Sequence, residues 1–232
     1  IDVSTEIIKK YKRAIKRRSK GEPVAYIIGK KEFWSIEFPI NRSSLIPRPE
    51  TELMIHELIK IYKNKKINIL DIGTGSGCIL LSLLKELISS YGIGIDISKN
   101  SINLAAKNAK KIKLATRTCF KVRSVSDFSL GKYDLIVSNP PYIPTKDLRN
   151  LSVDITNYEP LSALNGGIDG LDLIRKVIYK STHLLKKSGM LAVEIGNNQY
   201  KKVSDILERK GFRIVNKVID YNNNVRCIIS TK

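Results

Sequence analysis

From residue 67 onward, the sequence repeats one order of elements: an apolar strand, a loop, an amphipathic helix and then another strand. The repeat starts with the segments INILDIG, GCILLSLLKELI, GIGID and SINLAAKNAKK. Strands that alternate with helices are typical of βαβ units, whose strands lie parallel in one sheet. Further strands are expected at 119–122, 134–137 and 190–195, with helices near 170–186 and 198–210. The pattern therefore predicts an α/β fold with a parallel sheet.

The two ends of the chain depart from this repeat. Residues 212–219 and 225–230 are strand-like and are joined by the turn-rich YNNN, so we expect them to form an antiparallel hairpin. At the other end, a helix is expected to start near Ser4 and to stop at Gly21.

A second, smaller hairpin is expected between that first helix and the main domain. Residues 24–28 predict one strand of the hairpin, and EFWSIEFPI supplies the other. In the second strand, alternate apolar residues share one face, namely Trp34, Ile36, Phe38 and Ile40.

Composition limits the class of protein. The 232 residues are 42% hydrophobic, which supports one α/β domain with a core and a small appendage. No apolar run approaches the ~20 residues that a membrane span needs, and the first residues resemble an amphipathic helix and not a signal peptide. Three separated cysteines and two separated histidines form neither a disulfide framework nor a metal-ligand spacing. We therefore expect a soluble protein without a metal.

The chain carries a large positive charge. Its 41 Lys and Arg residues against 22 Asp and Glu give a net charge of +19, which attracts nucleic acid or an acidic protein surface. Between Lys9 and Lys20, eight of twelve residues are basic. Apolar residues recur there at helical spacing, so the same run also suits the solvated face of a helix. Charge alone therefore defines no site.

A glycine-rich loop, DIGTGSG at residues 71–77, lies between a predicted strand and a predicted helix. Its glycines let the backbone turn tightly and approach a ligand closely. Asp96 ends the next strand, where a carboxylate can accept hydrogen bonds from both hydroxyls of a ribose. The nucleoside could belong to NAD or to S-adenosylmethionine. The GxGxG spacing favours S-adenosylmethionine, because a dinucleotide usually requires the longer G-x-G-x-x-G.

A second motif, SNPPY at residues 138–142, ends another predicted strand. A proline pair cannot continue a sheet ladder, so we expect function where the strand stops. The Asn139 side-chain oxygen and the Pro140 carbonyl can each accept a hydrogen bond, and Pro141 restricts Pro140 to an extended conformation. Two acceptors suit one planar NH2 group, on which Tyr142 can stack. The motif therefore predicts methyl transfer to a glutamine amide or to the amine of adenine.

Five segments together resemble one protein family: GEPVAYIIGKKEFWS, LIPRPETE, LDIGTGSGCI, SNPPYI and YEPLSAL, with support from EIGNNQ, Asp220 and Arg226. They resemble the HemK/PrmC family of release factor glutamine methyltransferases, and the resemblance covers nearly the whole chain. The family implies a Rossmann-like seven-stranded methyltransferase sheet, here preceded by a helix and a β-hairpin. It implies that a methyl group passes from S-adenosylmethionine to the N5 nitrogen of the glutamine in the Gly-Gly-Gln loop of peptide chain release factors.

The resemblance also implies roles for particular residues. The cofactor loop is matched by Gly73, Thr74, Gly75, Ser76 and Gly77. Asp96 matches the acid that binds the ribose. The segment that holds the substrate glutamine is matched by Asn139, Pro140, Pro141 and Tyr142. Of these, Asn139, Pro140 and Tyr142 are expected to be catalytic, and Asn139 also to lie beside the cofactor.

The sequence departs from the family pattern at two places. The family usually has an acid and an aromatic residue beside the adenine; Asp127 and Phe128 supply this chemistry, but Ser124 and Val125 lie closer to the usual spacing. We expect Phe128 in this role, with the other alignment open. The family also has a helical N-terminal substrate domain, whereas this chain begins with Ile1 inside what resembles its last helix. We therefore expect a fragment with the end of that domain and the hairpin at 1–45 and the methyltransferase domain at 46–232.

Other functions compete with this reading. Adenine N6-methylation of DNA or RNA uses the same NPPY chemistry, as do ribosomal-protein glutamine methyltransferases, and a basic binding module without catalysis would also carry the charge. No segment for reading bases is evident, and aromatic residues form only 7% of the chain. EFWS favours the release factor enzymes. We expect release factors as partners, no membrane, no requirement for nucleic acid, and a location in the bacterial cytoplasm or in an organelle.

Overall fold

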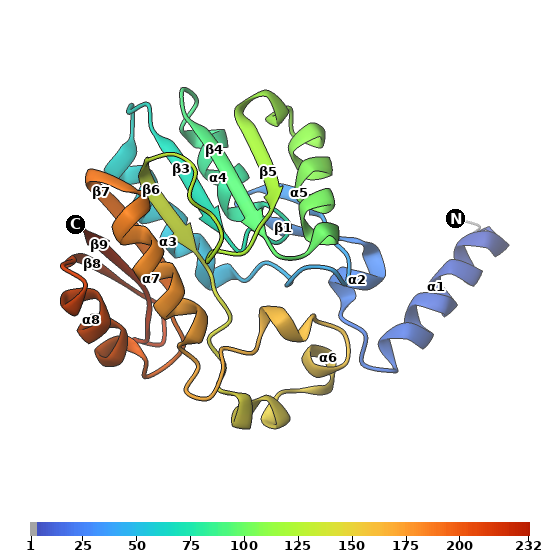
Figure 1. The fold of residues 1–232 in the computed structure, drawn as a ribbon. Coiled ribbons are helices and arrows are strands. Elements are labelled where there is room, and N and C mark those ends of the chain that lie inside the picture. The colour runs from blue at the N-terminus through green and yellow to red at the C-terminus, as the bar shows by residue number, and fades with distance from the viewer. Residues whose placement is uncertain (1–3) are drawn as a thin grey trace.

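The computed structural model describes residues 4–232 and contains a seven-stranded sheet with helices on both faces (Figure 1). The strand order is β5-β4-β3-β6-β7-β9-β8, in which β9 alone runs antiparallel to both of its neighbours. The strands are β3 (Asn68–Ile72), β4 (Tyr91–Asp96), β5 (Thr118–Val122), β6 (Tyr133–Ser138), β7 (Leu185–Glu194), β8 (Arg213–Ile219) and β9 (Val225–Thr231). The predicted fold class and the antiparallel C-terminal hairpin are confirmed.

The described residues form eight α-helices, five of which cover the two faces of the sheet. They are α1 (Thr5–Arg18), α2 (Val24–Ile28), α3 (Pro49–Tyr62), α4 (Cys78–Glu86), α5 (Lys99–Lys111), α6 (Val153–Thr156), α7 (Asp172–Leu184) and α8 (Tyr200–Arg209). Helices α3, α4 and α5 cover one face, and α7 and α8 cover the other. Helix α1 starts after the predicted cap, since the Ser4 side chain accepts a hydrogen bond from the backbone N–H of Ile7. Within residues 4–232, no helix combines the length and apolar character required to cross a membrane.

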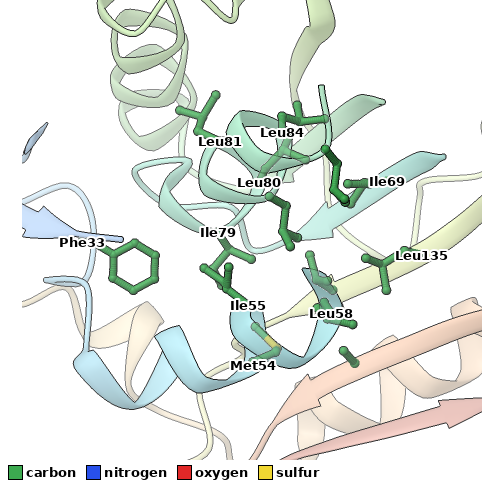
Figure 2. Packing of buried hydrophobic residues seen from close by; sticks show 14 of the residues in the cluster. Phe33, Met54, Ile55, Leu58, Ile69, Ile79, Leu80, Leu81, Leu84 and Leu135 are labelled. Atoms are coloured by element: carbon green, nitrogen blue, oxygen red, sulfur yellow. The ribbon is translucent and has the colours of Figure 1, made fainter. Parts of the chain in front are cut away.

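Alternate residues of the central strands serve the two faces of the sheet. Ile69 of β3 and Leu135 of β6 pack among α3 and α4, as Figure 2 shows around Leu58. Their sequence neighbours, Leu70 and Ile136, belong to the opposite layer with α7 and α8. Burying each side chain of this size contributes roughly 1.5–3 kcal/mol. Because both faces are covered, these strands are continuous apolar runs in the sequence.

The prediction that residues 24–28 form a strand is wrong, because they form the short helix α2. Pro23 precedes the first turn with its ring-restricted φ of −57°, and Gly29 ends the helix in the left-handed region at φ 74°. Five apolar residues in a row have no period that separates a strand from a buried turn of helix. The flanking proline and glycine were the signal for a helix.

The small hairpin consists instead of β1 (Lys30–Phe33) paired antiparallel with β2 (Ile36–Pro39). Its apolar face includes the predicted Ile36 and Phe38, but Phe33 takes the place expected for Trp34. Trp34 lies in the two-residue turn with φ 51°, so it leaves the alternation of the strand.

Helix α3 was not predicted, although the sequence contains its start signals. Pro49 occupies the first turn, and Glu50 and Glu52 place negative charge there, which favours the helix dipole. The buried residues recur at helical spacing, namely Met54, Ile55, Leu58 and Tyr62. This helix brings Thr51 to the carboxyl edge of the sheet.

A long connection between β6 and α7 lies below the carboxyl edge of the sheet in Figure 1. It contains α6 and two short 3₁₀ helices, Thr145–Asn150 and Leu161–Ala163. The buried Glu159 carboxylate fixes this connection, because it forms a salt bridge with Arg48 and accepts a hydrogen bond from the Ile46 backbone N–H at 3.2 Å. Residues of this connection therefore lie against the segment that precedes α3.

Gly77 starts α4 at φ 80°, and a Cβ there would lie 3.1 Å from the Ala105 Cβ of α5. Gly211 has nearly the same φ, 79°, but open space around the corresponding position. We predict that Gly211→Ala lowers the free energy of unfolding by about 1–2 kcal/mol, the backbone cost alone. Gly77→Ala should cost about 1–3 kcal/mol more, because α5 must also move. Urea denaturation measures both, and equal losses would show that the α4–α5 contact is not tight.

Candidate active site

A cavity of about 460 Å³ opens at the carboxyl ends of β3, β4 and β6. After β3 the chain continues to β4 on one side, whereas β6 pairs on the other side, so the strand order reverses at this point. Ligands of open α/β sheets bind at such a reversal, because the loops on its two sides diverge. The walls come from the glycine loop, the ends of β4 and β6, residues 123–126, the segment before α3, and the connection around Pro160.

The glycine loop borders the cavity with its backbone. Gly73 has φ 75°, and a Cβ there would meet no atom within 4 Å, so the loop leaves the space beside it free. The backbone N–H groups of Gly73 and Thr74 donate to the Ile95 carbonyl at 2.9 and 3.0 Å, which fixes the loop on β4. The Thr74 hydroxyl donates to the buried Asp71 carboxylate at 2.7 Å. The predicted residues Gly73, Thr74, Gly75 and Ser76 all line the cavity.

Asp96 lies at the end of β4 and lines the same cavity. One carboxylate oxygen accepts from the Gly75 backbone N–H at 3.0 Å, and the other from the Ser98 backbone N–H at 2.8 Å. Burial raises the pKa of this carboxyl, while these hydrogen bonds oppose the rise. Each oxygen retains a further lone pair, so the group can still accept from two hydroxyls.

Phe128 does not lie at this cavity. Its ring is only 2% exposed and packs in the core, 6.5 Å from the Tyr133 ring. The cavity wall near the end of β5 is formed instead by Ser124, Val125 and Ser126. The geometry therefore favours the alternative alignment, in which Val125 lies beside the adenine.

The SNPPY segment begins where β6 ends, between two cavities. Asn139 and Pro141 line the large cavity. Asn139, Pro140 and Tyr142 line a second, narrower cavity of about 180 Å³. Arg48 and Asn139 border both, so Asn139 stands at the junction. Burial raises the pKa of the Tyr142 hydroxyl to about 12, so this ring stays neutral at physiological pH.

Other residues that hold this segment were not assigned roles from the sequence. The Gln199 side chain donates to the Tyr142 carbonyl at 2.9 Å and accepts from the Gly196 backbone N–H at 2.8 Å. The Asn139 side-chain nitrogen donates to the Thr51 hydroxyl at 3.2 Å. Thr51 lies in LIPRPETE and Gln199 in EIGNNQ, two segments that carry the family resemblance, but their contacts join segments far apart in the sequence, so the motifs alone gave these residues no role.

Comparison with known proteins agrees with this geometry. Residues 63–227 match the family profile of a methyltransferase domain, and residues 1–29 match the PrmC N-terminal domain. A release factor glutamine methyltransferase from Caulobacter vibrioides is 37% identical over 236 residues, covering 100% of this chain and 81% of the relative. One from Buchnera aphidicola is 40% identical over 233 residues, covering 100% and 84%. One from Bradyrhizobium diazoefficiens is 40% identical over 195 residues, covering 82% and 66%.

The chain belongs to the release factor glutamine methyltransferase family. It spans 66% to 84% of the length of these three relatives. Membership confirms the resemblance seen in the sequence, and it makes the chain a methyltransferase with S-adenosylmethionine as methyl donor. The residues fit this cofactor, because the glycine loop leaves free space beside Gly73 and Asp96 keeps acceptors for the ribose hydroxyls.

Solved structures share the fold at low sequence identity. The hMettl16 catalytic domain, in complex with MAT2A 3'UTR hairpin 6, has a TM-score of 0.72 at 16% identity, covering 92% of this chain and 83% of that one. A magnesium protoporphyrin IX methyltransferase from Synechocystis with bound SAM has a TM-score of 0.56 at 14% identity, covering 79% of each chain. These similarities establish the arrangement of the sheet and its helices.

We predict that Asp96→Ala weakens S-adenosylmethionine binding strongly. The change removes two charge-assisted hydrogen bonds to the ribose, each worth roughly 1.5–3 kcal/mol, so affinity should fall by at least about tenfold. Isothermal titration calorimetry measures the loss. Asp205→Ala, on the exposed face of α8, is the matched control and should bind normally. Unchanged affinity in the Asp96 variant would refute the ribose assignment.

A second prediction separates the two alignments at the adenine. Val125→Asp places a charge on the cavity wall, so S-adenosylmethionine affinity should fall by about tenfold or more. Phe128→Leu changes the core and should lower the thermal unfolding temperature while affinity stays close to wild type. Calorimetry and thermal unfolding distinguish the variants, and the reverse pattern of affinities would restore Phe128 to the cofactor site.

Proposed function

We propose that the chain transfers a methyl group from S-adenosylmethionine to the side-chain amide nitrogen of the glutamine in the Gly-Gly-Gln loop of peptide chain release factors. The observation that carries this proposal is the position of Asn139 where the large and the narrow cavity meet, with Pro140 next to it in the wall of the narrow one. The large cavity suits the cofactor, and the narrow one admits the acceptor side chain.

The size of the narrow cavity supports an amino-acid side chain as the acceptor. Its volume of about 180 Å³ is below the roughly 300–1,000 Å³ of pockets that hold whole small-molecule ligands. Its walls are mainly apolar, with Leu45, Ile143, Ile155, Ala163 and Leu164 around the polar groups of Arg48 and Asn139. A slim chain that ends in an amide fits this lining, because its methylene groups meet apolar walls and its amide meets Asn139.

A glutamine amide is a poor nucleophile, and the residues of the site are proposed to orient its nitrogen for attack on the methyl group. Amide resonance delocalises the nitrogen lone pair, with a strength reflected in a rotation barrier of ~18–20 kcal/mol for the peptide bond. The Asn139 side-chain oxygen and the Pro140 carbonyl are proposed to accept the two amide hydrogens, which orients the nitrogen toward the large cavity. Tyr142 packs on the flat amide, and Pro141 keeps the Pro140 carbonyl in place.

When bound, S-adenosylmethionine supplies a methyl group on a positively charged sulfur, which leaves as a neutral thioether. As the amide nitrogen gains the methyl group it becomes more acidic, and its hydrogen bonds to Asn139 and Pro140 strengthen. One of its protons then passes to water, so the product amide is neutral. The residues thus stabilise the transition state more than the ground state, which is the condition for raising kcat.

The division into residues 1–45 and 46–232 is part of this proposal. The match of residues 1–29 to the PrmC N-terminal domain and of residues 63–227 to the methyltransferase domain supports a division between them. Ile1, where the first unit was predicted to begin, lies outside the described residues. We propose that the first unit contacts the release factor, and that catalysis requires no nucleic acid despite the net charge of +19. Location in the bacterial cytoplasm stays a prediction.

We predict that Asn139→Ala lowers kcat by about 10²–10³, because one preorganised polar group at the reacting nitrogen is lost, while cofactor affinity changes less. Asn139→Asp keeps an acceptor and should lose less activity than Ala. Asn68→Ala, exposed at the opposite end of β3, is the matched control and should keep wild-type activity. Methyl transfer from labelled S-adenosylmethionine to a release factor measures the rates.

Mass spectrometry of the product identifies the acceptor. One added methyl group on the Gly-Gly-Gln glutamine is the expected result. DNA and RNA offered in parallel should remain unmodified. Methylated adenine together with an unmodified glutamine would refute the proposal and establish an adenine methyltransferase instead.

A further inference from the structure

Two buried polar side chains, Thr51 and Glu194, form a hydrogen-bonded chain behind Asn139. The Thr51 hydroxyl of α3 donates to the Glu194 carboxylate at 2.7 Å, and the Asn139 amide nitrogen donates to the Thr51 hydroxyl at 3.2 Å. Thr51 is 2% exposed and Glu194 is 3% exposed. Glu194 ends β7, and the register of β6 with β7 pairs Ser138 with Val193, so Asn139 and Glu194 follow side by side.

The number of hydrogen atoms available for these two hydrogen bonds determines which way the Asn139 side-chain amide is turned. A threonine hydroxyl has one hydrogen to donate, and here it goes to the Glu194 carboxylate, which has none when ionised. The Thr51 oxygen can then only accept from Asn139. The NH2 group of Asn139 must therefore face Thr51, and its oxygen faces the other way, toward the junction of the two cavities.

We infer that Thr51 and Glu194 are positioning residues that keep the Asn139 side-chain oxygen directed at the substrate nitrogen. The inference deepens the proposed function and rests on it. A reversed Asn139 amide would present its own NH2 group to the NH2 group of the glutamine, and two donors cannot pair. Correct orientation is thus a condition for catalysis, and it depends on groups that do not touch the substrate amide.

Ionisation of Glu194 controls this orientation. Burial raises the pKa of the Glu194 carboxyl to about 7, and hydrogen bonds from Thr51 and Asn139 oppose the rise. The titratable groups that interact with Glu194 are Glu50 of α3, Cys78 of α4, Tyr142 after β6, and Arg226 and Cys227 of β9. Burial raises the pKa of both thiols and of the Tyr142 hydroxyl, so these three stay neutral near pH 7.

The direction of the pH effect follows from the hydrogen bonds. Above the pKa, the carboxylate can only accept, and the Asn139 oxygen faces the cavities. Below the pKa, the carboxyl carries a proton that it can donate to Thr51, whose own hydrogen is then free to bond the Asn139 oxygen. Asn139 can reverse in that state. The rate of methyl transfer should therefore rise as the pH increases through about 7.

The decisive experiment is a double-mutant cycle on kcat for methyl transfer to a release factor. Thr51→Val removes the hydroxyl with little change in volume and should lower kcat by roughly 10–100-fold, as loss of an outer hydrogen-bond partner does at metal sites. In the Asn139→Ala background it should cost less than about twofold, because Thr51 acts through Asn139. Thr51→Ser keeps the hydroxyl and should restore most of the rate.

Two controls accompany the cycle. Ser181→Ala removes another buried hydroxyl, which donates to a backbone carbonyl within α7, and should leave kcat unchanged. Glu194→Gln cannot ionise, so the rise in rate near pH 7 should disappear in this variant. Equal losses from Thr51→Val in both backgrounds, or an unchanged pH profile in Glu194→Gln, would overturn the inference.

An NMR measurement tests the inference independently of activity. The side-chain NH2 signals of Asn139 should shift with pH with a midpoint of about 7 in the wild-type protein, and this shift should be absent in Glu194→Gln. Signals that do not respond to pH in the wild type would overturn the inference, whatever the substrate proves to be. A wild-type protein that titrates as expected but leaves the glutamine unmethylated would instead refute the proposed function.

Discussion

The parallel pairing of β3 with β6 determines where the rest of the site lies. The register places Ile72 beside Ser138, and the Ser138 hydroxyl donates to the Ile72 carbonyl at 2.7 Å. Because the two strands end level, the glycine loop after β3 and Asn139 after β6 emerge next to each other. A methyl donor and its acceptor must approach within contact distance, and this ladder sets that approach before any ligand binds.

Much of the fold and part of the site could be predicted because the determining signals are local. The strands before the glycine loop and after the helix that follows it are apolar runs of ordinary length, with residues that end a strand on both sides. The βαβ order was therefore evident from the sequence. Asp96 ends a strand, Gly73 to Ser76 and Asn139 directly follow strands, and parallel strands direct such positions to one edge of the sheet. Their convergence follows from topology alone.

The remainder depends on contacts that no local pattern contains. Phe128 and Val125 are three positions apart in one loop and both are buried, and only the path of the loop shows that Val125 also borders the large cavity. Thr51 and Glu194 are separated by 143 residues, and their hydrogen bond exists because α3 packs over the end of β7. A threonine and a glutamate in isolation resemble surface residues, so their burial had to be observed.

The hairpin turn carries the only tryptophan of the chain. The Trp34 indole N–H donates to Glu86 of α4, and its backbone N–H donates to Glu52 of α3, each at 3.0 Å. The chain that follows this hairpin forms a wall of the large cavity at Ser43 and Leu45. The fluorescence of this one indole is therefore an intrinsic probe of whether the hairpin is docked and the cofactor cavity is closed on that side, with no added label.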